Sequence, residues 1–375
     1  MKWFASELHT HTLHSDGRQT LEELAAGAAG LGFDAIALTD HNTMSGLIGR
    51  AEIGQKYGVH IIPGMEWTTF YGHMVTIGLE AFADWRDVNR HDIDKGIAAV
   101  HQHGGIAGIA HPFRIGSPAC TGCYWEYELN DWNQVDYIEV WSGTFPSILR
   151  SNHRAFELWT QKLNEGYRIT ATSGRDWHTQ EPTDDPISVT YLGIEEIDET
   201  RQSESPLEGQ SGMNTYAEGE AWIGSVDEKD LINSLRKGRA AVTMGPLLTL
   251  TISSDEITYS LGAVIPAQQS RSQPVDAKLL AHVAVDFMVR AGKWSMPEQT
   301  LTLKLCSNLG EEQQVKIEWH PNQQRINFSM PLKIGTAAES CRRWIRAECW
   351  GTIRGAYVQI AFTNAIYFEE GARQT

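Results

Sequence analysis

The sequence predicts an α/β fold in its first part and an antiparallel β-sandwich in its last part. Up to about residue 245, short apolar runs alternate with amphipathic segments, which is typical of strands joined by crossover helices in a parallel sheet. Beyond that point, apolar runs with alternating polarity are separated by polar turns, as in antiparallel sheets. Because 375 residues exceed the usual size of one domain, we expect two, at 1–245 and 246–375.

The first elements have clear local signals. Thr20 and Glu23 form a capping box at the start of a helix that Gly32 ends, and apolar residues recur between them at helical spacing. A buried strand is expected at 35–39, because this stretch is apolar and follows the helix directly. The alternation then continues with helices at 45–57, 88–102, 147–165 and 227–237, and strands at 59–62, 74–77, 106–110, 137–140 and 169–172.

The second part has six expected strands, each bounded by polar turn residues. They lie at 247–252, 281–289, 301–305, 315–319, 344–349 and 357–362. Between the two parts, the stretch from about 195 to 220 is rich in Glu, Ser, Gly and Gln and is interpreted as a surface insertion.

Composition excludes several classes of protein. The 31 basic and 47 acidic residues give a formal charge of −16, which argues against binding to a nucleic acid polymer or an anionic membrane. The sequence has no run of about 20 apolar residues, so a membrane span is not expected. The first residues lack the pattern of a secretory signal, and five cysteines are a poor disulfide framework, so we expect a cytoplasmic protein.

Polar side chains occur where predicted strands end. They are His9 and His11, Asp40 and His41, Glu66, His111, and Asp176 with His178. Loops at the carboxyl ends of parallel barrel strands meet at one mouth, so these groups should be neighbours in space. Imidazoles mixed with carboxylates suit Zn²⁺, Mn²⁺ or Fe²⁺ better than Ca²⁺, which prefers oxygen ligands alone. In extended chain, the i, i+2 spacing of His9 and His11 lets both bind one ion.

These residues lie in motifs that resemble one family. The stretches ELHTHTLHSDG, ALTDHNT, IIPGMEWT, GIAHPFR and SGRDWH, in this order, resemble the PHP (polymerase and histidinol phosphatase) family over about residues 6–245. The resemblance implies a distorted (β/α)7 TIM-like barrel with two or three divalent metal ions, Zn, Mn or Fe, at its mouth. The tail, with RAAVTMGPLL, WIRAECWG and AFTNAIYF, looks like the narrower CehA/McbA-type metallohydrolases.

The resemblance also implies a ligand set. In this set His9, His11, Glu66 and Asp176 surround one metal, and Glu66 bridges to a second ion that His111 also holds. Further ligands implied for a third ion, or for the second where only two are used, are Asp16, His41 and His178. His73 is either another ligand or a strand histidine. Asp40 is expected to orient a ligand instead of binding metal.

Most catalytic PHP proteins hydrolyse phosphate esters, so the resemblance implies a metal-dependent phosphoesterase acting on small mono- or diesters. A hydroxide bridging two metals, held through Glu66 and Asp176, would attack phosphorus. Arg114 and Arg175 are candidates for stabilising the phosphoryl oxygens, or are structural ion-pair residues; Arg175 could also stack on Trp177. The alternatives are hydrolysis of carbamate, ester or amide bonds, and a non-catalytic metal-binding scaffold. The expected partner is a small phosphoester, and homo-oligomerisation is left open.

Overall fold

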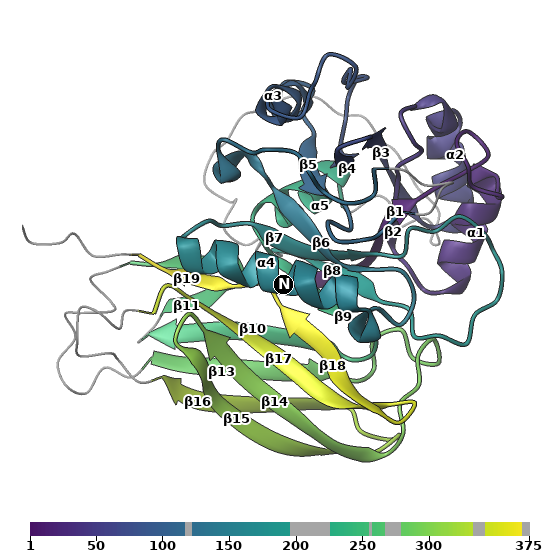
Figure 1. Cartoon of the computed structure of the whole chain (residues 1–375). Helices are drawn as coiled ribbons and strands as arrows, with labels where there is room; N and C mark the ends of the chain where they lie inside the picture. Colours follow the sequence, from purple (N-terminus) through teal and green to yellow (C-terminus); the bar gives the residue numbers. More distant parts are fainter. Residues whose placement is uncertain (117–121, 196–225, 255–256, 267–278, 333–341, 370–375) are drawn as a thin grey trace, which may run out of the picture.

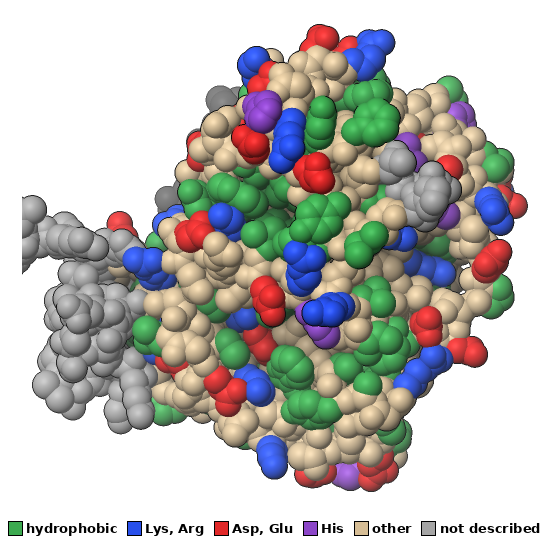
Figure 2. All heavy atoms as spheres, viewed as in Figure 1, with side chains coloured by type: hydrophobic (Ala, Val, Ile, Leu, Met, Phe, Trp, Pro, Cys, Tyr) green, Lys and Arg blue, Asp and Glu red, His purple; other side chains and the backbone are tan. Residues whose placement is uncertain are grey.

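The structure is a computed structural model that describes residues 1–116, 122–195, 226–254, 257–266, 279–332 and 342–369. It has a mixed α/β fold in which an α/β part lies above a region built almost wholly of strands (Figure 1). Most of the predicted insertion, residues 196–220, lies outside the described residues. Figure 2 shows the same side of the molecule, on which acidic and basic side chains lie interspersed.

The α/β part alternates strands and helices up to Thr243. Its strands are β1 (Lys2–Thr10), β2 (Ala35–Leu38), β3 (His60–Thr69), β4 (Gly72–Ile77), β5 (Ile106–Ile109), β6 (Tyr137–Ser142), β7 (Thr170–Gly174), β8 (Val189–Ile194) and β9 (Ala240–Thr243). Its helices are α1 (Leu21–Gly30), α2 (Arg50–Tyr57), α3 (Ile93–Gln102), α4 (Arg150–Glu165) and α5 (Glu228–Arg236). The expected capping box is present, because Thr20 accepts from the N–H of Glu23 and Glu23 accepts from the N–H of Thr20.

The remaining strands form the all-β region. They are β10 (Leu247–Ser254), β11 (Ile257–Ser260), β12 (Val264–Ile265), β13 (Leu279–Asp286), β14 (Gln299–Ser307), β15 (Gly310–Trp319), β16 (Arg325–Leu332), β17 (Trp344–Ile353), β18 (Ala356–Thr363) and β19 (Ile366–Phe368). One sheet has the order β11-β10-β13-β16, and β10 packs on β17 and β18 of the other sheet. Strands β11, β12, β16 and β19 escaped the sequence prediction, because they are short or largely polar.

A single large sheet runs through both parts of the chain. Its order is β12-β19-β17-β18-β9-β8-β1-β2-β3-β4-β5-β6-β7, with β14 paired to β17 and β15 to β14. Strands β1, β2 and β3 are mutually parallel, as are β5, β6 and β7, in agreement with the α/β expectation. Among β1–β7, strand β4 is the exception and runs antiparallel to both of its neighbours. Strand β8 is antiparallel to β1 and to β9. The turn between Thr69 and Gly72 is too short for a crossover, so the chain must reverse there.

Strand β7 ends the sheet, and side chains satisfy its open edge. Asn364, which is buried, accepts from the N–H of Ala171 at 2.7 Å and donates to the carbonyl of Ala171 at 2.9 Å. The hydroxyl of Thr190 accepts from the N–H of Ser173 at 2.8 Å and donates to its carbonyl at 3.1 Å. Ala171 and Ser173 present these groups on the same edge of the strand. The amide and hydroxyl therefore replace a neighbouring strand, which a buried edge requires.

The all-β region packs on the α/β part through α4, which lies across β17 and β18 (Figure 1). Arg346 of β17 is buried here, with its guanidinium 4.4 Å from the ring of Phe156 and 4.8 Å from that of Trp159. Its Nε donates to Glu348 at 2.9 Å, so the buried charge is paired as well as stacked. This contact holds β17 against α4.

Two positions differ from the sequence prediction. His9 lies within β1 and not after its end, and Glu66 lies in the middle of β3, which extends past the expected 59–62. The extension occurs because β3 leaves β2 at its end and continues as a hairpin with β4. Helices expected from 88 and 147 begin at Ile93 and Arg150.

None of the helices in the described ranges combines the length and apolar character needed to cross a membrane. Cys306 and Cys349 are free thiols, whereas Cys123 is disulfide-bonded. The cytoplasmic location stays a prediction.

We expect Asn364→Ala to lower the free energy of unfolding by about 2–4 kcal/mol, because two buried backbone groups of Ala171 lose their partners. Denaturant titration followed by tryptophan fluorescence measures this change. The exposed Asn322 offers a matched control, and Asn322→Ala should change stability by less than about 0.5 kcal/mol. Equal effects of the two substitutions would contradict the role of Asn364.

Candidate metal centre

Four side chains from three strands meet at the end of β1. His9 belongs to β1 and His11 follows it, Glu66 comes from β3, and Asp176 follows β7. Backbone hydrogen bonds join the end of β1 to the segment that follows β7. The N–H of His11 donates to the carbonyl of Trp177 at 2.9 Å, and the N–H of Trp177 donates to the carbonyl of His9 at 3.0 Å. The carboxyl ends of strands β1 and β7 therefore lie beside one another. This alignment brings Asp176 to the two histidines.

The four ligand-type atoms are arranged as if around one point. His9 Nε2 lies 3.2 Å from Glu66 Oε2 and 3.4 Å from Asp176 Oδ1. His11 Nε2 lies 3.4 Å and 3.1 Å from the same two oxygens. Ligands held tetrahedrally at about 2.0–2.1 Å from a zinc ion are about 3.3–3.4 Å apart. The observed spacings match this separation.

None of these four buried atoms makes a hydrogen bond of good geometry among the described residues, although His41 Nδ1 lies 2.9 Å from Glu66 Oε2. Buried polar atoms are normally satisfied, so four orphaned atoms at one point need an explanation. A divalent cation bound between them would satisfy all four at once. The donor set of two imidazoles and two carboxylates is suitable for such an ion.

A second group shares Glu66. Its other oxygen, Oε1, lies 2.9 Å from His73 Nδ1 and 3.2 Å from His111 Nε2. The two oxygens of one carboxylate thus face two separate groups of histidines, which is the arrangement that a bridging ligand requires. The structure brings His73 into this group, where the sequence left its role open.

A third group lies towards solvent. Asp16 Oδ1 is 3.0 Å from His178 Nε2 and 3.4 Å from His41 Nε2, and His11 is close enough to share a cation with them. The three groups together, which we call the cluster, contain every residue predicted as a ligand. These are His9, His11, Asp16, His41, Glu66, His73, His111, Asp176 and His178.

The ionisable groups of the cluster shift one another's pKa values. Burial opposes ionisation of Glu66, but the charge of His9 and hydrogen bonds from the other histidines outweigh it and hold the pKa of Glu66 well below its usual value. The pKa of Asp176 is likewise lowered, because His9 and His11 outweigh its burial. Conversely, although burial lowers it, the carboxylates of Asp16 and Glu66 raise the pKa of His41 to about 10. Ionised carboxylates are therefore balanced by cations, a role that metal ions can take.

Two cluster residues have unusual backbone conformations. His111 has φ +27° and Asp176 has φ +55°, in the left-handed region that side chains other than glycine rarely adopt. Such strain persists only where the surroundings enforce it, and it concentrates at functional sites. For Asp176, the paired hydrogen bonds between Trp177 and β1 supply that constraint.

Other side chains orient the cluster from behind. Nδ1 of His9 donates to Glu139 Oε2 at 2.7 Å, which leaves its Nε2 free to face the other ligand-type atoms. A carboxylate behind a metal-binding imidazole is a common arrangement. Asp40, which was expected to orient a ligand, contacts the loop between His11 and Asp16. It accepts from the N–H of Thr12 and from the hydroxyl of Ser15, both at 2.7 Å, and so orders the loop that carries Asp16.

The two predicted arginines lie in different surroundings. Arg114, half-exposed, pairs with Oδ2 of Asp176, the oxygen that does not face His9 and His11. It is therefore placed at the edge of the cluster. Arg175 lies over the ring of Trp177, with its guanidinium 4.5 Å from the ring centre. This is the stacked position that the sequence left as one alternative, and a catalytic role for Arg175 stays a prediction.

Glu7 is a residue that sequence reasoning missed. It is buried beneath the cluster, where its Oε1 accepts from the N–H of Arg175 at 2.8 Å and from that of His9 at 3.1 Å. Burial raises the pKa of Glu7 to about 7, although these hydrogen bonds lower it in part. The carboxylate thus joins β1 to the end of β7. Its i, i+2 relation to His9 was the available signal.

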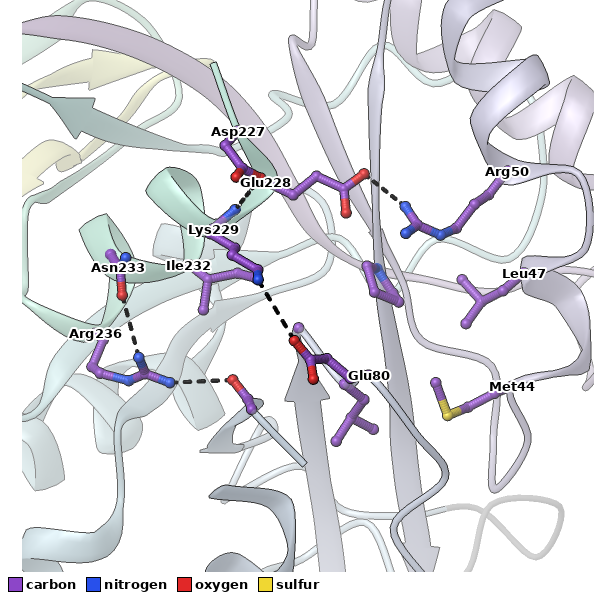
Figure 3. Close-up of a pocket in the computed structure, with 14 residues that line it drawn as sticks. Met44, Leu47, Arg50, Glu80, Asp227, Glu228, Lys229, Ile232, Asn233 and Arg236 are labelled. Carbon is purple, nitrogen blue, oxygen red and sulfur yellow. Dashed lines mark hydrogen bonds and ion pairs between the residues drawn. The ribbon is translucent and has the colours of Figure 1, made fainter. Parts of the chain in front are cut away.

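A separate hollow of about 470 Å³ lies between α2, α5 and the β3–β4 region and contains none of the predicted site residues. Figure 3 shows Arg50 directed towards Glu228, and Lys229 towards Glu80. The nitrogen–oxygen distances of these ion pairs are 2.6 Å for Arg50 and Glu228 and 3.7 Å for Lys229 and Glu80. These four charges are therefore paired with one another within the chain.

Comparison with known proteins supports the sequence motifs. The family model described as PHP domain matches residues 7–132. Over 64 residues the chain is 36% identical to a phosphoribosyl 1,2-cyclic phosphate 1,2-diphosphodiesterase from Eggerthella lenta, covering 17% of this chain and 24% of that protein. It is 36% identical over 85 residues to an error-prone DNA polymerase from Symbiobacterium thermophilum, covering 22% and 8%. The chain therefore matches less than a quarter of the length of these curated relatives.

A solved structure is similar over most of the chain. It is a two-domain protein from Bacteroides vulgatus, described as containing a predicted PHP-like metal-dependent phosphoesterase. Its sequence identity is 14% and its TM-score 0.44, with 97% of this chain and 95% of that chain covered. These matches do not extend to the CehA/McbA-type subgroup, which stays a prediction. The PHP domain model matches 126 of the 375 residues, so it supports the expected family over about a third of the chain.

Proposed function

We propose that this protein is a metal-dependent hydrolase that cleaves small phosphate mono- or diesters. The observation that carries the proposal is the set of three adjoining ligand groups that share Glu66 and His11, with Arg114 at their edge. Adjoining cation sites suit phosphoryl transfer, where charge on both the attacking and the leaving oxygen must be stabilised. The PHP domain match and the diphosphodiesterase relative add support from a different direction.

The proposed metal ligands follow the three groups. His9, His11, Glu66 and Asp176 would hold one divalent ion, and Glu66 with His73 and His111 a second. Asp16, His41 and His178, with His11, would hold a third. Zn, Mn or Fe ions in such sites supply Lewis acidity and ionise a water molecule near neutral pH. The number of ions, two or three, and their identity are part of the proposal.

The chain's own residues then have separate tasks. The Glu139 carboxylate holds the imidazole of His9 in one orientation and tautomer. Arg114 is half-exposed beside Asp176, so its guanidinium can donate to phosphoryl oxygens of a bound ester. The hydrogen bonds between Trp177 and β1 keep Asp176 in position without reorganisation during the reaction.

We also infer a distorted seven-stranded barrel from β1–β7, followed by a sandwich domain from about residue 246. Support comes from the packing of β7 against β1 and β8, with Asn364 and Thr190 satisfying its edge. The same donor set could act on a carbonyl, so hydrolysis of carbamate, ester or amide bonds remains the competing proposal. A non-catalytic scaffold is disfavoured, because all nine expected ligand residues converge.

Zn²⁺ or Mn²⁺ should raise the Tm of the chelator-treated protein, because a cation satisfies the four orphaned atoms and neutralises buried carboxylates. His11→Ala should reduce this gain and lower metal content by at least one ion per chain. Differential scanning calorimetry and elemental analysis give the two readouts. His320→Ala, at an exposed histidine of the all-β region, should leave both unchanged. An undiminished metal content in His11→Ala would contradict the ligand assignment.

Glu139→Gln should lower metal affinity or kcat by about 10–100-fold while leaving the fold intact, because the amide cannot accept from His9 with the strength of a carboxylate. Competition with a chromogenic chelator measures the affinity, and circular dichroism checks the fold. Wild-type affinity and kcat in this variant would show that Glu139 does not orient His9.

The reaction class is tested by hydrolysis of p-nitrophenyl phosphate, bis(p-nitrophenyl) phosphate and an aryl methylcarbamate by one metal-loaded preparation. We expect turnover of a phosphoester that is lost on chelation. Asp176→Ala should reduce kcat by at least about 100-fold with little loss of stability, because mouth residues contribute chemistry more than core packing. Carbamate turnover with inert phosphoesters would refute the proposal in favour of carbonyl chemistry.

A further inference from the structure

Exposed apolar side chains gather on the loops that carry the cluster. Among the described residues, fourteen large hydrophobic side chains are exposed, and seven of them lie on the segments that follow β1, β3, β5 and β6. One of the seven, Tyr71, packs edge-on against Tyr127. We call the other six the mouth rim: Leu13, Phe70, Ile115, Tyr124, Ile148 and Leu149. Single exposed hydrophobic residues are ordinary, but a group around one site indicates a binding surface.

Three rim residues lie within four positions of a cluster residue in the chain. Leu13 lies between His11 and Asp16 and is 62% exposed. Ile115 follows Arg114, the cation paired with Asp176, and is 86% exposed. Phe70, 79% exposed, is in the turn that joins β3, which carries Glu66, to β4. Their side chains are thus exposed although cluster residues lie within four positions of them in the chain.

Two of the other rim residues, Leu149 and Tyr124, are tied to the same region by contacts. A Cβ built on Gly143 would lie 3.8 Å from Leu149, and the N–H of Gly143 donates to the carbonyl of Gly174, two residues before Asp176. Tyr124 packs edge-on against Phe113, which directly precedes Arg114. The Tyr124 hydroxyl accepts from Arg154 at 3.0 Å, so this ring is fixed in place.

The loops that hold the polar and charged cluster thus also carry an exposed apolar surface, the mouth rim. A ligand that only places a phosphate group on the cluster would leave this surface in water. A ligand with an apolar group beside its phosphate would cover both, since the rim side chains are attached to the loops that hold the cluster. Arg114 and Arg154 lie among the rim residues, so the border also suits a ligand whose charged end is anionic.

We propose that the ester cleaved at this site has an apolar alcohol part, an aryl or alkyl group, that packs on the mouth rim. This inference rests on the proposed function and specifies its substrate class. The apolar group contributes binding through burial, and the phosphate provides the interaction with the cluster. The rim therefore selects among phosphoesters and does not take part in the chemical step.

Binding of unreactive phosphonates tests the proposal without relying on turnover. Methylphosphonate and hexylphosphonate carry the same anionic group and differ only in apolar length. Each methylene fully removed from water strengthens binding by about fourfold, so hexylphosphonate should bind at least about tenfold more tightly even if the rim covers only two of them. Isothermal titration calorimetry on the metal-loaded full chain gives both affinities.

Matched variants locate the effect. Ile115→Ser and Phe70→Ser together should reduce the preference for hexylphosphonate below about threefold while leaving the affinity for methylphosphonate unchanged. Ile257→Ser removes an exposed isoleucine from β11 of the all-β region, and should retain the full preference. Because all three residues are exposed, the substitutions should leave the fold intact.

The outcomes separate this inference from the proposed function. Equal affinities for the two phosphonates in the wild type would overturn the rim inference and leave the phosphoesterase proposal standing. Binding of neither phosphonate to metal-loaded protein would overturn both. Co-sedimentation with phosphatidylcholine vesicles that is lost in Ile115→Ser, together with equal phosphonate affinities, would assign the rim to a lipid surface and also overturn the proposal.

Discussion

The seam between β1 and β7 is the constraint on which the centre depends. Strand β7 ends the large sheet, so its open edge must be satisfied by something other than a ladder. Asn364 and Thr190 bind the edge within β7 itself. The segment that follows β7 is bound to the end of β1 through Trp177. Glu7 joins the same two segments beneath the cluster. Asp176 reaches His9 and His11 only because this seam is held closed.

The close approach at the seam also explains one glycine. A Cβ at Gly174 would lie 2.5 Å from both Glu139 Oε2 and the Cβ of His9, too close for any other residue. The absence of a side chain lets β7 pass directly beside His9 and its carboxylate partner. Local strain at Asp176 and His111 is confined to the ends of β7 and β5, where stable hydrogen bonds hold the flanking backbone. The positions of the side chains in the cluster are thus fixed by the packing and backbone hydrogen bonds behind them.

Charge balance is a second requirement of this design. Glu66 and Asp176 are buried carboxylates, which are unfavourable in a protein interior unless paired. In this chain the pairing comes from histidines, whose pKa values the same carboxylates alter. The all-β region contributes indirectly, since Asn364 belongs to it and secures β7. The region below the α/β part is therefore part of the support for the centre and more than an appended layer.

Much of the site could be predicted from local sequence, because short motifs carry the ligands in pairs. His9 with His11, and Asp176 with His178, have spacings that keep both side chains within reach of one another, and all nine expected ligands converge. The sequence by itself also determined the helix capped by Thr20 and the change to β structure after residue 245. Only the tertiary structure decided the antiparallel β4, the bond from Glu139 to His9, and the roles of Glu7 and Asn364. Those contacts join residues distant in the chain, and no local pattern records which buried groups will meet.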